Sequence, residues 1–392
     1  MDIASRIADR RRAVWWDTSP RDAAAFETLV TTPVTAGDWP LATEVALGRI
    51  PVYEGDAIPT REEARADMAA EWATAFLTGP GIVVIRGAAE RAVVDAASDV
   101  FDRIIDAERA AGTGGGDHFA KPGANDRVWN AVQKHAFTDP ANFARYYACD
   151  ALALASLAWL GPGYQVTAQV NRVNPGGAAQ VPHRDYHLGF MDAAQAARWP
   201  AQAHALSPAL TLQGAIAHCD MDAAMGPTML LPHSQKVPEG YLAFHDPAFR
   251  DVFARHHVQI PMRMGDAVFF NPAVMHGAGT NRTSDRRRMV NLFQVSSAFG
   301  RAIESVDRTA IAKAVFPALS ELSADLGRSG TENVICAASE GYPFPTNLDR
   351  NPPRDGMAPP SPRDVMRLAL SEDWGADRFA GALDRMAEAD RP

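Results

Sequence analysis

The central part of the chain consists of short apolar and β-branched runs that are separated by glycine, proline and asparagine. The runs occupy residues 164 to 300, and no long helical pattern lies between them. Such runs are typical of strands, and the residues between them favour turns. Many short strands without long intervening helices predict two sheets closed into a jelly roll. The predicted strands include YQVTAQVNRV, ALTLQGAIAHCD, TMLLP, VQIPMRMGDAVFFNP, AVMHGAG and RRMVNLFQVS.

Helical patterns flank this mainly β core on both sides. Apolar residues recur at three- and four-residue spacing within 60–77, and an apolar stripe within 93–105 follows the strand-like run IVVIRG. Helical spacing returns within 311–326 and again near the C-terminus, after a proline-rich passage. We therefore predict an N-terminal helical extension (1–80), a core domain with leading helices (81–300), and a C-terminal helical and proline-rich extension (301–392).

Composition and charge exclude several classes of protein. Lysine and arginine number 38 against 47 acidic residues, and the net charge of −9 argues against a nucleic-acid partner. Three widely spaced cysteines indicate a reducing compartment rather than a disulfide framework. No segment has the length and apolarity needed to span a membrane, and the N-terminus lacks a secretory signal. We expect a cytoplasmic protein that acts on a small molecule, and the sequence leaves its oligomeric state open.

The triplet His183-Arg184-Asp185 offers two metal ligands from one short segment. On a strand, residues i and i+2 point the same way, so the imidazole of His183 and the carboxylate of Asp185 would meet at one point. A third ligand from a neighbouring strand would complete one face of an octahedron, and His276 in AVMHGAG is the candidate. Two histidines and one carboxylate with open coordination positions suit non-haem Fe(II) oxygenases. We therefore predict a catalytic iron site at these three residues.

A second triplet of the same form lies at His218-Cys219-Asp220. Chance alone predicts about 1.3 such triplets in a chain of this composition, so the bare motif is weak evidence. Asp220 and Asp222 lie in the turn CDMDAAMGP and are ordinary turn formers. The first triplet follows the turn NPGG and has more polar residues around it. We therefore assign the metal to the first triplet and a structural role to the second.

Several motifs, taken in order, resemble the phytanoyl-CoA dioxygenase family of Fe(II)/2-oxoglutarate oxygenases. They are NPGG followed by HRD, then MGPTMLLPHSQK, GDAVFFNPAVMHGAGTN, and an arginine eleven residues after His276. The likeness covers about residues 80–300. It implies a double-stranded β-helix, the cupin-like jelly roll, with iron held by His183, Asp185 and His276. It also implies 2-oxoglutarate as cosubstrate, with its C5 carboxylate paired to Arg287.

The physical reason for an arginine holds without the resemblance. The far carboxylate of the cosubstrate needs a cation in a buried pocket, and a guanidinium binds it through two parallel hydrogen bonds. Arg286, Arg287 and Arg288 compete for this role. The spacing from His276 selects Arg287, which would share a strand face with Met289. A bulge in the strand would shift the assignment by one residue.

Polar residues in otherwise apolar runs are candidates for the lining of the site. Relatives usually have a hydroxyl residue where this chain has Ala278, so Thr280 is expected to assist cosubstrate binding, together with Gln169 and Asn171. The candidate substrate contacts are His187, Gln213 and Arg172. Strand alternation gives the strand residues even odds of facing solvent, and a lone extra histidine is more often structural.

These residues predict an Fe(II)/2-oxoglutarate-dependent dioxygenase that consumes O2, hydroxylates an unactivated C–H bond of a small molecule, and releases succinate and CO2. Desaturation, ring expansion and epimerisation are alternative outcomes. Halogenation is disfavoured because Asp185 fills the position that chloride would need. Two other classes stay open. They are a cupin-like metalloenzyme without 2-oxoglutarate, such as an isomerase or an intradiol- or extradiol-type dioxygenase, and a non-catalytic β-barrel binding protein.

Overall fold

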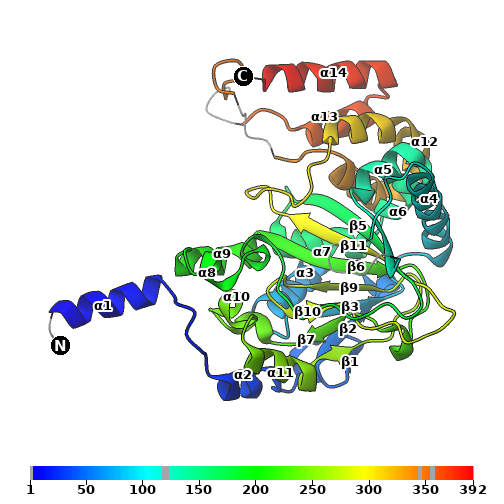
Figure 1. The fold of residues 1–392 in the computed structure, drawn as a ribbon. Coiled ribbons are helices and arrows are strands. Elements are labelled where there is room, and N and C mark those ends of the chain that lie inside the picture. Colours follow the sequence, from blue (N-terminus) through cyan, green and yellow to red (C-terminus); the bar gives the residue numbers. More distant parts are fainter. Residues whose placement is uncertain (1–2, 117–122, 343–346, 354–357, 392) are drawn as a thin grey trace.

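The computed structural model of the chain describes residues 3–116, 123–342, 347–353 and 358–391 (Figure 1). Its centre is a mixed eight-stranded sheet of order β1-β2-β3-β9-β6-β11-β5-β4, beside a three-stranded antiparallel sheet of order β10-β7-β8. The strands are β1 Glu44–Ala46, β2 Ile50–Glu54, β3 Ile82–Arg86, β4 Asn125–Val128, β5 Gln165–Val173, β6 Thr211–Ala217, β7 Met229–Leu231, β8 Val258–Gln259, β9 Ala267–Phe270, β10 Met275–Gly277 and β11 Arg288–Ser296.

Alternate residues of the central strands enter two different cores. In β9, Ala267 and Phe269 belong to a core beneath the helices, whereas Val268 and Phe270 belong to a core shared with the small sheet. This alternation follows from the two-residue period of side chains along a strand. The large sheet is therefore covered on both faces, and the small sheet lies over one of them.

Helices cover the outer faces of both sheets. Figure 1 shows α4, α5, α6 and α12 together on one side of the large sheet, and α2, α10 and α11 beside the small sheet. Leu231 and Met275 of the small sheet pack with Phe249 and Phe253 of α11. The α-helices are α1 Ile3–Val14, α2 Ala23–Val30, α3 Glu62–Leu77, α4 Arg91–Ala110, α5 Ala131–Thr138, α6 Pro140–Tyr147, α7 Asp150–Leu160, α8 Ala193–Ala196, α9 Ala201–Ala209, α10 Gly240–Ala243, α11 Pro247–His256, α12 Arg308–Ala338, α13 Pro362–Ser371 and α14 Ala376–Ala389.

The prediction of a mainly β protein is not confirmed. The described residues form fourteen α-helices and eleven strands, although the two sheets do form the centre. Four of the helices, α8 to α11, lie between predicted strands, where the sequence indicated loops. They are at most ten residues long, so their apolar periodicity extends over too few turns to be recognised.

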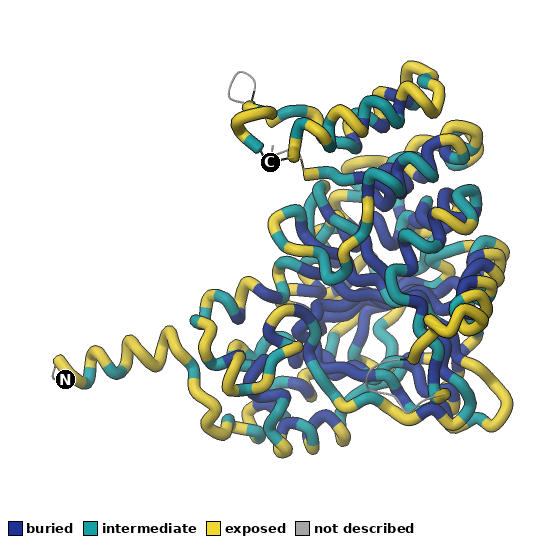
Figure 2. The backbone as a smooth tube through the Cα atoms, turned by 45° about the horizontal axis from the view of Figure 1, so that its top comes forward, coloured by how far each residue is buried: buried dark blue, intermediate teal, exposed yellow. Residues whose placement is uncertain are grey.

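The N-terminal part contains strands as well as helices. Within 1–80, predicted as a helical extension, β1 and β2 join the large sheet, and Val52 of β2 pairs in parallel with Val84 of β3. The run IPVYE is short and contains a proline, which hides a strand pattern. Helix α1 buries no residue and projects away from the body (Figures 1 and 2). The division of the chain into three parts stays a prediction.

The C-terminal part is helical where the sequence indicated helices. The predicted helix at 311–326 is the first part of α12, which is kinked at Gly327, where φ is 67°. The proline-rich passage lies partly outside the described residues, at 343–346 and 354–357. None of the helices within the described ranges combines the length and apolarity that crossing a bilayer requires. All three cysteines are free thiols.

Candidate metal centre

The three predicted metal ligands lie together in the structure. Nε2 of His183 is 3.5 Å from Oδ1 of Asp185, and Nε2 of His276 is 3.6 Å from Oδ2 of the same carboxylate. One ligand atom from each residue lies within 4.8 Å of the other two. Ligands bound about 2.1 Å from one metal ion lie roughly 3 Å apart, so a small inward movement would let all three atoms share an ion.

Hydrogen bonds turn the same nitrogen of both imidazoles toward this centre. Nδ1 of His183 lies 2.8 Å from the carbonyl oxygen of Val181, and Nδ1 of His276 lies 2.9 Å from that of Val274. A carbonyl only accepts, so each Nδ1 carries the proton and each Nε2 keeps its lone pair. Bonds of this kind orient histidines that bind metals. Two such nitrogens and one carboxylate fit a divalent transition metal with open positions.

The neighbours of Asp185 favour its charged form. Burial acts to raise the pKa of this carboxyl, but His183, His276 and Gln213 together outweigh burial and lower it. Nε2 of Gln213, on β6, donates to Oδ2 of the carboxylate, and the Tyr241 hydroxyl donates to the Asp185 backbone carbonyl over 3.1 Å. Gln213 was expected to contact substrate. In the structure it orients a predicted metal ligand as well as lining the site.

The two histidines approach each other because their backbones pair. Each amide donates to the carbonyl of the other over 2.9 Å, which forms an isolated antiparallel bridge beside the small sheet. The HRD triplet was expected within a strand, but Tyr186 has a left-handed φ of 67° and turns the chain away. Arg184 is buried and donates to the carbonyl of Ser234. This bond anchors the triplet from the side opposite to the metal centre.

A buried arginine lies one residue beyond the predicted one. Arg287 is exposed, whereas Arg288 is 4% exposed and donates to the carbonyls of Met225 and Gly279 over 2.9 and 3.0 Å. Burial lowers the pKa of Arg288 to about 10, so it remains a cation at neutral pH. Within the described part of the chain, no carboxylate pairs with it. The predicted Arg287 does not line the cavity, whereas Arg288 does, on the same side of β11 as Val290.

The ligands and Arg288 line one cavity of about 430 Å³ between the two sheets. Gln169 and Asn171, predicted as cosubstrate residues, project into it from β5. The volume lies in the ordinary range for small-molecule sites, and a mostly apolar wall with a few convergent polar groups is typical of them. The apolar wall includes Ala215, Met221, Met262, Val268, Phe270, Val290 and Leu292.

The sequence of this region matches one known family. A family model described as phytanoyl-CoA dioxygenase (PhyH) matches residues 78–289, which is more than half of the chain and includes all three ligands and Arg288. The chain belongs to the phytanoyl-CoA dioxygenase family. The family that the ordered motifs predicted is thereby confirmed. No curated protein sequence is similar enough to the chain to count as a match.

Two solved structures are among those similar to this phytanoyl-CoA dioxygenase family member. The non-haem α-ketoglutarate-dependent carbocyclase SnoK, from nogalamycin biosynthesis, has a TM-score of 0.42 and 19% identity over 58% of this chain and 83% of its own. HygX from Streptomyces hygroscopicus, with nickel and 2-oxoglutarate bound, has a TM-score of 0.37 and 16% identity over 58% of this chain and 87% of its own. These identities are too low to transfer a substrate to this chain.

Arg172, a predicted substrate contact, lies on the wrong face of β5. It is ion-paired to Asp102 and Asp126 on the helix side of the sheet. Because side chains alternate along a strand, the face that carries Gln169 and Asn171 into the cavity turns Arg172 away from it. Arg172 therefore has a structural role and is corrected as a substrate contact.

Two further predicted contacts do not line the cavity of this family member. The Thr280 hydroxyl accepts a hydrogen bond from the Ala179 amide over 3.1 Å. His187 is exposed, and its Nδ1 lies 3.0 Å from the Ser207 hydroxyl. His187 begins a short 3-10 helix and Thr280 lies in irregular chain after β10, so strand alternation does not predict where their side chains point. Thr228, which follows the Gly-Pro turn, is a hydroxyl residue that does line the cavity.

Sequence reasoning missed residues at the far end of the cavity. Arg127 and Trp129 lie there from the region of β4, with the guanidinium carbon 4.9 Å from the centre of the indole ring. Glu304 lies there from the connection between β11 and α12. These residues belong to segments without a regular pattern, so only the folded chain brings them together.

The second H-x-D triplet is structural, as predicted. His218 is buried, with Nδ1 2.9 Å from the Ser98 hydroxyl and Nε2 2.8 Å from the Tyr146 hydroxyl. Asp220 is exposed and pairs with Arg91. Both nitrogens of the imidazole are therefore occupied inside the helix-side core, and its acidic neighbour faces solvent.

Proposed function

We propose that this chain is an Fe(II)/2-oxoglutarate-dependent oxygenase that hydroxylates a C–H bond of a small molecule. The observation that carries the proposal is a single cavity that holds two imidazoles, one carboxylate and, beyond them, a buried guanidinium with no carboxylate partner among the described residues. Membership of the family supports it. The proposed ligands are His183, Asp185 and His276, and the proposed partner of the cosubstrate is Arg288.

Each residue has a defined part in this proposal. His183, Asp185 and His276 would hold the iron and would leave coordination positions open for cosubstrate and O2. Iron with 2-oxoglutarate and O2 supplies the oxidising power, and succinate and CO2 are released. Arg288 binds the distal carboxylate of the cosubstrate and Thr228 offers it a hydroxyl. The apolar wall excludes water from the reacting C–H bond.

The proposal is tested by measuring succinate release and iron content together. Protein loaded with Fe(II) without air is expected to bind about one iron per chain and to convert 2-oxoglutarate to succinate when O2 is admitted. Asp185→Ala or His276→Ala removes one of three ligands, so turnover is expected to fall at least a hundredfold while the circular dichroism spectrum is kept. Asp220→Ala changes the acidic residue of the second triplet and serves as the matched control, with turnover unchanged.

The same measurements separate the two rival classes. A metalloenzyme that does not use 2-oxoglutarate would retain iron but release no succinate. A non-catalytic binding protein would retain no iron. Full turnover in Asp185→Ala would refute the iron assignment itself. Analysis of the product distinguishes hydroxylation from desaturation or epimerisation, because only hydroxylation adds one oxygen atom from O2 to the substrate.

A further inference from the structure

A row of polar side chains extends the cavity away from Arg288. Gln294 lies on the same face of β11, six residues further along, which corresponds to about 20 Å of strand. Nε2 of Gln169 donates to Oε1 of Gln294 over 3.1 Å, and Asn171 lies on the same face of β5 as Gln169. The amides therefore follow the cavity from the Arg288 end, where Asn171 lies opposite Val290, to the far end, where Gln294 pairs with Gln213.

Three oxygen atoms of residues that line the cavity accept no hydrogen bond from the described residues. They are Oδ1 of Asn171, Oε1 of Gln213 and Oε2 of Glu304. The orientation of the Gln213 amide is settled, because its nitrogen donates to the carboxylate of Asp185. A buried acceptor without a donor loses its bonds to water and gains none in return, so native structures pair such groups with water or a ligand. The three oxygens therefore indicate a ligand with several N–H or O–H groups.

Glu304 adds a negative charge to this end of the cavity. Its Oε1 accepts a hydrogen bond from the Asn130 amide over 2.8 Å, while Oε2 has no hydrogen-bond partner among the residues that the structure describes. Burial raises the pKa of Glu304, although the Asn130 amide, the neighbouring Gln169 side chain and the charges of Arg127 and Lys134 act in the opposite direction. No lysine or arginine nitrogen in the described ranges lies within 4.0 Å of the carboxylate. A cation beside Oε2 would supply both the missing donor and the missing charge.

We propose that the substrate is a compact polar molecule whose protonated amine binds Glu304 and whose other N–H or O–H groups bind Asn171 and the glutamine row. This inference rests on the proposed function, because 2-oxoglutarate must take the Arg288 end for the substrate to take the other. A long acyl chain supplies no donor to these oxygens. A cavity of about 430 Å³ that also holds the cosubstrate leaves space for a small molecule only.

The test uses pairs of compounds that differ only in the charge of the amine. The panel consists of small amino alcohols, amino sugars and amino acid amides, each with its N-acetyl derivative. Dissociation constants are measured by calorimetry on the full chain loaded with Fe(II) and 2-oxoglutarate without air, and succinate release is then measured with O2. We expect amines to bind at least tenfold more tightly than their N-acetyl partners and to stimulate succinate release.

Two variants test whether the preference for amines over N-acetyl compounds depends on Glu304. Glu304→Gln keeps the oxygen that accepts from Asn130 but removes the charge, so the preference for the amine is expected to fall below threefold. Glu321→Gln changes an exposed carboxylate on α12 and is expected to keep the full preference. The inference is overturned if N-acetyl or long-chain acyl compounds bind as tightly as the amines, or if Glu304→Gln keeps the tenfold preference.

The experiment distinguishes a failure of the proposed oxygenase function from a failure of the amine inference. If the iron-loaded wild-type chain releases no succinate with any compound, the oxygenase proposal fails, while calorimetry still reports whether amines are preferred. If succinate is released but neutral partners stimulate it equally, the oxygenase proposal stands and the amine inference fails. Should Glu304→Gln not fold, the paired compounds on the wild-type chain still decide the question.

Discussion

Arg288 is the residue on which cosubstrate affinity is expected to depend most. Its guanidinium is buried and bonds only backbone carbonyls among the described residues, so it retains its charge for a ligand. Arg288→Met is expected to raise the KM for 2-oxoglutarate about thirtyfold or more, because a hydrogen bond to a charged group contributes about 1.5–3 kcal/mol. Initial rates of succinate release at varied 2-oxoglutarate measure the effect.

The neighbouring arginine offers a matched control for this prediction. Arg287→Met removes the same charge and length one residue earlier, where the side chain is exposed. We expect the KM for 2-oxoglutarate to stay within twofold of the wild-type value. Equal effects of the two substitutions would show that net positive charge, rather than a specific guanidinium in the cavity, governs cosubstrate binding.

The difference between Arg287 and Arg288 shows where sequence reasoning reaches its limit at this scale. The chemistry of the cosubstrate predicted an arginine. The alternation of side chains then divided the three neighbouring arginines between the two faces of one strand. The face that turns inward depends on where β11 begins and how it pairs with β5, and Arg288 pairs with Val173 at the first position. The number of residues between His276 and an arginine does not determine this pairing register.

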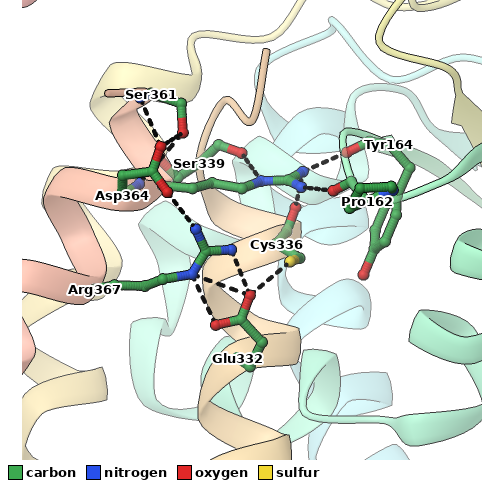
Figure 3. A network of polar contacts seen from close by, with 9 residues as sticks. Pro162, Tyr164, Glu332, Cys336, Ser339, Ser361, Asp364 and Arg367 are labelled. Carbon is green, nitrogen blue, oxygen red and sulfur yellow. Dashed lines mark hydrogen bonds and ion pairs between the residues drawn. The ribbon is translucent and has the colours of Figure 1, made fainter. Parts of the chain in front are cut away.

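At the scale of elements, α13 is attached to the rest of the chain by one buried arginine. Arg363 is 1% exposed. Its guanidinium donates to the carbonyls of Ser339, Pro162, Cys336 and Tyr164. Figure 3 shows these acceptors converging from α12 and from the segment before β5. One side chain therefore joins three parts of the chain that are distant in sequence.

This attachment predicts a large loss of stability on substitution. Arg363→Met leaves several buried carbonyls without a donor, and we expect the free energy of unfolding to fall by about 3 kcal/mol or more. Arg367→Met is the control from the same helix. Its ion pairs with Glu332 and Asp364 (Figure 3) join side chains that are 41 to 47% exposed, so a loss of about 0–1 kcal/mol is expected. Urea unfolding measures both, and similar losses would contradict the attachment by Arg363.

The elements that carry the site were only partly predictable. Strands such as β5, β6 and β11 were recognised because each contains a short apolar run that is bounded by turn residues. The HRD segment was expected to be a strand, yet it is held by a single bridge to His276 and by Arg184. Such contacts are made between segments distant in sequence, and local pattern does not encode them.

At the scale of the whole molecule, the large sheet separates two interiors with different chemistry. One face forms the cavity, and the other packs against the helices, where His135 and His218 lie buried. Burial lowers the pKa of His135 to about 4 and that of His218 to about 3, the latter also through the neighbouring His135. His135 contacts Asn142, and His218 contacts Ser98 and Tyr146. Neutral imidazoles can make all of these hydrogen bonds.

These two histidines predict a loss of stability in mild acid. Unfolded histidine takes up a proton near pH 6.5, whereas the folded chain keeps both imidazoles neutral down to about pH 4, so the unfolded state binds more protons within this range. Stability therefore falls as pH falls, by about 1.4 kcal/mol per pH unit for each histidine. Urea unfolding between pH 7 and 4.5 measures the slope.

The variant His218→Gln tests the contribution of one of the two histidines. It is expected to remove about half of the pH dependence that the two histidines cause together, whatever its effect on stability at pH 8. An unchanged slope would mean that His218 is protonated inside the folded protein, which the geometry of its contacts with Ser98 and Tyr146 argues against.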